Sequence, residues 1–123
     1  MIRTEVIIGV ADVEKSSAWY QSLLNCKSMH GGNTFEILAD MDDTVILCLH
    51  KWAAHDHPTL NSPRIKPGNG LILYFRVTDL NGIWHNAQNL HAVIEVSPHI
   101  NENSHEEEFS LRDLDGYYVT VSL

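Results

Sequence analysis

Histidine, cysteine and glutamate residues carry most of the chemistry that this sequence of 123 residues could perform. The most compact group is His55-Asp56-His57, because alternate residues of an extended strand point the same way and could share a metal ion. The group stands directly before Pro58, in a segment without strand periodicity, and short motifs outside their structural context often match by chance. We therefore interpret these residues as part of a connector rather than as metal ligands.

A second group, Cys48 and His50, lies two residues apart on an expected strand, so both side chains share one face with Ile46. A thiol and an imidazole could act as a nucleophile and its base. No third residue orients the pair, and we interpret both as walls of a pocket. The other histidines show no spacing typical of chemistry: His30, His85, His91, His99 and His105.

The composition restricts the classes of function. With 44% hydrophobic residues the chain can bury the core of one domain, and its formal charge of −8 argues against a nucleic-acid or anionic-membrane partner. No apolar run is long enough to span a membrane, and the N-terminus does not read as a signal peptide. Two cysteines do not make a disulfide framework, so we expect a cytoplasmic protein with free thiols.

Two stretches, EKSSAWYQSLL and NGIWHNAQNL, have the spacing of helices that bury one stripe. Each follows a V-x-D start, and the two starts lie 67 positions apart (77 minus 10). Asp12 and Asp79 can cap the helices, and Asn25 tolerates the left-handed conformation at a helix end. The stripes are Tyr20, Leu23 and Leu24 in the first helix and Ile83, Ala87 and Leu90 in the second.

Strand-like stretches precede and follow each helix, which predicts the order βαβββ written twice. TEVIIGV and LILYFRV precede the helices, and three stretches follow each, near 27–30, 34–38 and 44–50 and near 93–99, 106–112 and 117–123. We expect an α+β fold: a single domain, 1–123, made of two modules of about 3–51 and 70–123. The Pro- and Gly-containing segment 52–69 connects them.

The end of the chain repeats an earlier pattern. FSLRDLDGYYVTVSL at 109–123 matches FEILADMDDTVILCL at 35–49 without a gap, at an offset of 74 (109 minus 35). We expect the repeated apolar positions, among them Phe35, Ile37, Leu47 and Leu49, to face the helices. The positions between them would then line a cleft enclosed by the bare faces of the two sheets.

The sequence resembles the vicinal oxygen chelate superfamily, which includes glyoxalase I, bleomycin-resistance proteins and extradiol dioxygenases. The resemblance rests on V-A-D-V-x-K-S-x-x-W-Y-x-x-L-L at 10–24 and F-x-L-R-D-L-D-G-Y at 109–117, and it covers nearly the whole chain. Leu114 replaces the proline usual in that turn. The resemblance implies a sheet curved around a small-molecule cleft, usually in a homodimer.

In enzymes of the superfamily, four strand positions usually hold a divalent metal. Carried onto this chain they are Glu5, Ile72, Thr120 and Ile46, with Cys48 in place of Ile46 if that strand slips by two residues. A divalent ion needs several anionic or imidazole donors, and only Glu5 is a good one. We therefore expect no metal and no cofactor.

The retained cleft without its metal predicts a small-molecule-binding protein, similar to bleomycin-resistance proteins, that sequesters a ligand and has no catalytic residues. The alternative is a metal-dependent lyase, isomerase or dioxygenase in which Glu5, Cys48 and His50 supply rearranged ligands. A third possibility is metal-free acid–base catalysis by Glu5 or His50.

Aromatic and polar side chains on the bare faces complete the expected ligand site, since apolar area gives affinity and placed polar groups give orientation. Arg76 could meet an anionic group of the ligand or pair with Glu5, and Trp52 could close the pocket or cover the dimer interface. The predicted ligand-binding set is Glu5, Ile7, Ile46, Cys48, His50, Trp52, Ile72, Tyr74, Arg76, Tyr118 and Thr120.

Overall fold

The computed structural model describes residues 1, 3–55, 57–69 and 71–123. It divides into two compact units, Met1–Lys66 and Pro67–Leu123. Among the described residues, no helix is both long enough and apolar enough to cross a membrane.

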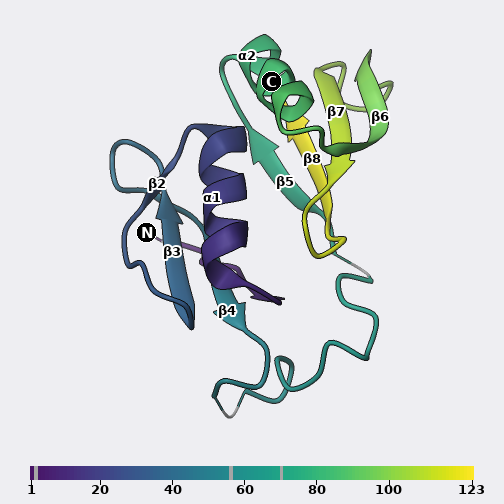
Figure 1. The fold of residues 1–123 in the computed structure, drawn as a ribbon. Coiled ribbons are helices and arrows are strands. Elements are labelled where there is room, and N and C mark those ends of the chain that lie inside the picture. Colours follow the sequence, from purple (N-terminus) through teal and green to yellow (C-terminus); the bar gives the residue numbers. More distant parts are fainter. Residues whose placement is uncertain (2, 56, 70) are drawn as a thin grey trace. The chain divides into compact units, whose positions relative to one another are not determined.

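The first unit is a four-stranded sheet with one helix (Figure 1). Its elements are β1 (Ile7–Val10), α1 (Val13–Leu24), β2 (Lys27–Ser28), β3 (Phe35–Ala39) and β4 (Val45–Lys51). The strand order is β1-β4-β3-β2, with β1 parallel to β4 and the other neighbours antiparallel. The first strand thus pairs with the last strand of its own unit.

The second unit repeats this arrangement, with strand order β5-β8-β7-β6 (Figure 1). Its elements are β5 (Leu73–Arg76), α2 (Leu80–Asn89), β6 (Val93–Ile100), β7 (Glu107–Arg112) and β8 (Tyr118–Ser122). Again the first strand is parallel to the last, and the other pairs are antiparallel. The predicted α+β fold of two βαβββ modules is confirmed.

The helix boundaries follow the predicted caps. The carboxylate of Asp12 accepts a hydrogen bond from the Lys15 N–H, and that of Asp79 accepts one from the Gly82 N–H, each at 3.0 Å. These bonds satisfy N–H groups that the first turn of a helix leaves without partners. Asn25 ends α1 with φ 55°, the left-handed conformation expected of it.

The core of the first unit forms where α1 covers one face of the sheet. Tyr20 and Leu23 of α1 are fully buried, as are Leu38 of β3 and Leu47 and Leu49 of β4. Burial of each such side chain contributes about 1.5–3 kcal/mol. The apolar residues that alternate along β4 therefore fix which face of this strand lies under the helix.

The predicted gap-free repeat is wrong in its register. Cys48 pairs with Ile7 as Thr120 pairs with Tyr74, so β4 and β8 correspond at an offset of 72 (120 minus 48). Glu36 pairs with Leu49 as Phe109 pairs with Val121, so β3 and β7 correspond at an offset of 73 (109 minus 36).

This shift changes the face of two residues. Phe35 pairs with His50 and Ile37 with Cys48, so Phe35 and Ile37 lie on the bare face and not under the helix as expected. A slip of one residue moves a strand's side chains to the opposite face, and a bulge at Leu38/Ala39 accompanies it here. The even offset of β4 leaves Leu47 and Leu49 on the expected face.

Candidate functional site

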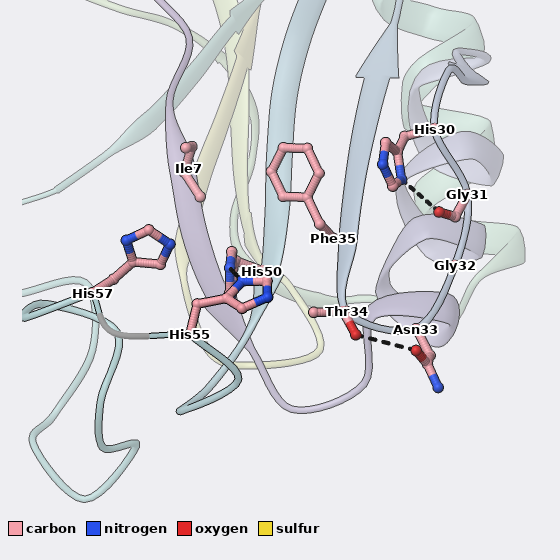
Figure 2. A pocket seen from close by; sticks show the side chains of 10 residues that line it. All are labelled: Ile7, His30, Gly31, Gly32, Asn33, Thr34, Phe35, His50, His55 and His57. Carbon is pink, nitrogen blue, oxygen red and sulfur yellow. Dashed lines mark hydrogen bonds between the residues drawn. The ribbon is translucent and has the colours of Figure 1, made fainter.

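A hollow of about 600 Å³ lies on the bare face of the first unit (Figure 2). This is within the range of roughly 300–1,000 Å³ that small-molecule sites occupy. Three strands, the loop between β2 and β3, and the segment after β4 contribute to it. Its lining consists of Ile7, His30, Gly31, Gly32, Asn33, Thr34, Phe35, His50, His55 and His57.

Strand pairing sets the floor of the hollow. His50 in β4 pairs with Gly9 on one side and with Phe35 on the other, so its ring shares the bare face with the Phe35 ring. The two rings meet edge to face with centroids 6.0 Å apart, and Phe35 meets His30 in the same way at 5.2 Å. These rings give the hollow a rigid aromatic floor.

The loop between β2 and β3 forms one wall of the hollow, the loop wall. It is held by a buried carboxylate, Glu36, which lies on the opposite face of β3. Its oxygens accept hydrogen bonds from the backbone N–H groups of Gly31 (2.8 Å) and His30 (3.2 Å). They also accept from the hydroxyls of Ser17 in α1 and Ser28 in β2, both at 2.8 Å. Glu36 therefore ties the loop to the helix and to the neighbouring strand.

These bonds also determine the charge of Glu36. Burial by itself raises the pKa of this carboxyl, but the hydrogen bonds from Gly31, Ser17, Ser28 and His30 together outweigh it and hold the pKa below its ordinary value of 4.5. A carboxylate that accepts several N–H and O–H donors is stabilised in its charged form. Glu36 is thus an ionised structural group beneath the loop and does not line the hollow.

Three histidines converge at one wall of the hollow. His50 is buried and central in its sheet, whereas His55 and His57 are exposed and belong to the segment after β4. The His50 Nε2 and His55 Nδ1 atoms lie 3.0 Å apart, and one nitrogen from each of the three rings lies within 4.8 Å of the others. Asp56, between the two exposed histidines, lies outside the described residues.

The predicted ligand residues of the first unit do not all line the same hollow. Ile7 and His50 line the hollow. Cys48 is fully buried in the same face, and the ring of Trp52 packs against Gly9. Glu5 borders a different hollow of about 370 Å³, near Thr44 and Val45, and Ile46 is half-buried in β4.

The predicted residues of the second unit lie on its own sheet or, for Ile72, directly before β5. The Arg76 guanidinium lies 5.6 Å from the Tyr74 ring centre and donates to the Leu123 carbonyl oxygen at 2.8 Å. The predicted residue Tyr118 lies beneath the Arg112 guanidinium, which is 4.9 Å from its ring centre. Ile72 is exposed, and the buried hydroxyl of Thr120 bonds to that of Ser110 at 2.9 Å.

The four positions that the resemblance assigns to a metal are a poor set of metal donors in this chain. Isoleucine at 46 and 72 offers no donor, and the Thr120 hydroxyl is already paired with Ser110. The register makes Cys48 the counterpart of Thr120, as the two-residue slip anticipated, but burial raises the pKa of the Cys48 thiol and so opposes the thiolate that binds metals. Glu5 remains the single strong donor among them.

Sequence reasoning missed the loop wall, its support by Glu36, and the meeting of His50 with His55 and His57. Two signals for the histidines were present, the His-x-His spacing and the bare-face parity of His50, but nothing in the periodicity joins them. Glu36 gave a weaker signal: a charged residue at a position whose neighbours along the strand are apolar.

No family model matches this sequence, and no curated protein matches it. The structure, in contrast, is similar to several solved ones. A glyoxalase/bleomycin resistance protein/dioxygenase family enzyme from Burkholderia phytofirmans PsJN is 19% identical, with a TM-score of 0.77 over 96% of this chain and 94% of that one.

Two further solved structures show the same likeness. TioX from Micromonospora sp. ML1 is 11% identical, with a TM-score of 0.77 over 99% of this chain and 98% of that one. Lactoylglutathione lyase from Agrobacterium tumefaciens is 15% identical, with a TM-score of 0.73 over 98% and 92%. At such identities the likeness is one of fold, and it agrees with the glyoxalase-like fold expected from the sequence.

Proposed function

We propose that this chain is a small-molecule-binding protein of the glyoxalase/bleomycin-resistance type that sequesters its ligand against the bare face of the first unit. We further propose that it does so without a metal at the four strand positions where enzymes of this fold carry one. The single observation that carries the proposal is the hollow on that face, whose volume of about 600 Å³ suits a small molecule.

The chemistry of the hollow supports a compound with a flat apolar part and a few polar groups. Phe35 and Ile7 offer apolar area, and the loop that contains Asn33 and Thr34 offers polar groups at the rim. A ring stacked beside Phe35 would gain roughly 0.5–1.5 kcal/mol beyond its area burial. The ligand that fits best is therefore an aromatic compound with polar substituents at one edge.

A thermal-shift screen of aromatic natural products tests the proposal, because a ligand that binds only the folded state raises Tm. We expect a hit to raise Tm in the unaltered protein and to raise it much less in Phe35→Ala. The matched control is Val93→Ala, an exposed apolar residue of β6 outside the hollow, which should keep the full shift. Equal Tm shifts in Phe35→Ala and Val93→Ala would show that the ligand binds outside the hollow.

The alternative, a metal-dependent lyase, isomerase or dioxygenase, is favoured by one observation: three histidines converge at the wall of the hollow. The two candidates differ in what happens to the bound compound. A binding protein returns it unchanged, and an enzyme converts it. Incubation of each hit with the purified protein, followed by mass spectrometry of the recovered compound, separates them.

We also propose that the protein forms a homodimer, as the resemblance implies. Sedimentation velocity over a range of concentrations measures this directly, and we expect twice the 13.9 kDa mass of the chain. A monomer at every concentration would contradict the dimer without affecting the hollow.

A further inference from the structure

The three histidines at the wall of the hollow have the arrangement of a metal site. Their ring centroids are 5.0 Å apart for His50–His55, 5.0 Å for His50–His57 and 6.0 Å for His55–His57. A tetrahedral Zn²⁺ ion with nitrogens at 2.0–2.1 Å needs its ligand atoms roughly 3.3 Å apart. The nitrogens here lie within 4.8 Å of one another, so side-chain rotation must bring them closer by about 1.5 Å at most to reach that spacing.

The hydrogen bond of His50 to the backbone determines which of its two ring nitrogens can bind a metal. Its Nδ1 lies 2.8 Å from the Lys51 carbonyl oxygen, and because a carbonyl only accepts, Nδ1 must donate. In the neutral ring the lone pair is then on Nε2, the atom that faces His55. Histidines that bind metals commonly donate their second N–H to a backbone carbonyl in this way, which fixes the tautomer.

Backbone turns after β4 bring the two exposed histidines back to His50. The Ala53 N–H donates to the Leu60 carbonyl at 2.7 Å, and the Leu60 N–H donates to the His57 carbonyl at 3.0 Å. The His57 N–H in turn donates to the His55 carbonyl at 2.9 Å. The segment therefore closes on itself and presents both imidazoles on the side of the buried one.

We propose that His50, His55 and His57 bind one Zn²⁺ ion at the wall of the hollow. The cluster consists of imidazoles alone, a donor set that suits zinc and neighbouring first-row ions and disfavours Mg²⁺ and Ca²⁺, which prefer oxygen. Three histidine ligands leave at least one coordination position of a four-coordinate ion open. All three histidines line the hollow, so we expect that position to open into it.

This arrangement also specifies the class of ligand, and that part of the inference rests on the proposed function. A compound held in the hollow would bind the ion through one donor atom, such as a carboxylate, phenolate or thiolate. Its aromatic part would lie beside Phe35. The site differs from the four strand positions described above, because it uses the end of β4 and the segment that follows.

The competing explanation is an ordinary hydrogen bond in which His55 Nδ1–H donates to His50 Nε2. Metal titration distinguishes the two. Untagged protein, freed of metal with a chelator and dialysed, should bind one Zn²⁺ per chain in competition with a chromophoric chelator. Added Co²⁺ should give the intense visible bands of a four-coordinate ion.

Single substitutions assign the site. His57→Gln and His55→Gln change exposed side chains, so both variants should fold, which the Tm of the metal-free proteins checks. Each should weaken Zn²⁺ binding by about 100-fold or more, whereas the control His85→Gln, an exposed histidine of α2, should leave it unchanged. Absence of stoichiometric Zn²⁺ binding, or equal loss in His57→Gln and His85→Gln, would overturn the site.

A comparison of the Zn²⁺-loaded and metal-free proteins in the thermal-shift screen separates this inference from the proposed function. Compounds with donor groups that raise Tm only in the Zn²⁺-loaded protein support both the metal site and the small-molecule function. Hits with equal shifts in the two forms keep the proposed function and contradict the metal as ligand anchor. Stoichiometric Zn²⁺ binding without any hit keeps the metal site and contradicts the small-molecule function.

Discussion

The two units have the same topology but join helix to sheet by different chemistry. In the second unit the Trp84 ring of α2 meets the Phe109 ring of β7 edge to face at 5.1 Å. At the corresponding positions the first unit has Ser17 and Glu36, joined by a buried hydrogen bond of 2.8 Å. The apolar alternation common to both units therefore determines the topology, and the residue pair at this junction can vary from rings to a charged hydrogen bond.

The difference has a consequence for the surface of the first unit. A phenylalanine at position 36 could fill the junction, but it could not accept hydrogen bonds from the loop that ends at β3. Glu36 accepts from two N–H groups of that loop and so holds one wall of the hollow in place. The first unit thus uses a core residue to position the loop that lines its hollow.

The largest effect that we expect comes from Phe109→Ala, because the side chain is fully buried in the ring junction of the second unit. The substitution should lower the free energy of unfolding by about 3–5 kcal/mol. Urea denaturation monitored by circular dichroism measures this. The loss should be the same at pH 7 and pH 4, since no charge is involved. A loss below 1 kcal/mol would contradict the account of the ring junction.

Glu36→Gln tests the polar junction and should lower the free energy of unfolding by about 1.5–3 kcal/mol at pH 7, because hydrogen bonds to a charged acceptor become neutral ones. The carboxyl pKa is lower in the folded than in the unfolded chain. Its contribution is therefore present above the ordinary value of 4.5 and decreases as pH falls through the folded-state pKa.

Unfolding of both proteins between pH 7 and pH 3 checks the sign of this effect. The difference between the unaltered protein and Glu36→Gln should shrink on acidification. Glu102→Gln, in an exposed turn of the second unit, is the control and should change stability little at any pH. A difference that grows toward low pH would show that the charged form of Glu36 is not the stabilising one.

The smallest effects on stability are expected from substitutions at Gly9 in β1 and at Arg76, which occupies the corresponding position in β5. An added Cβ at position 9 would lie 2.7 Å from the Trp52 ring, so Gly9→Ala should displace the ring at a cost of about 1–3 kcal/mol. Arg76→Ala removes an exposed side chain that has one hydrogen bond to a backbone carbonyl and an exposed contact with the Tyr74 ring, and it should cost about 1 kcal/mol or less. Tryptophan fluorescence should change only in Gly9→Ala. Equal costs would contradict the close packing of Trp52.

Much of the fold could be predicted because short-range physics determines it. Asp12, Asp79 and Asn25 marked helix ends by backbone chemistry that acts within a few residues. The faces of Phe35 and Ile37 were predicted wrongly, because the gap-free repeat could not reveal the bulge at Leu38/Ala39 that changes the register. One unpaired residue is enough to reverse a face.

The candidate site was harder to predict, because it depends on the path of the chain after β4. His50 was placed on the bare face by parity alone. His55 and His57 reach it through turns in which Ala53 has φ 58°, a left-handed conformation that alanine seldom adopts and that composition does not signal. Tertiary context, not local propensity, thus assembles the histidines.

The most direct test of the central claim, that the first unit holds the ligand, is a backbone amide NMR titration with the compound that gives the largest thermal shift. We expect the resonances that change most to be those of the loop wall, Gly31 to Phe35, and of His50. Changes confined to β5–β8 would contradict the claim.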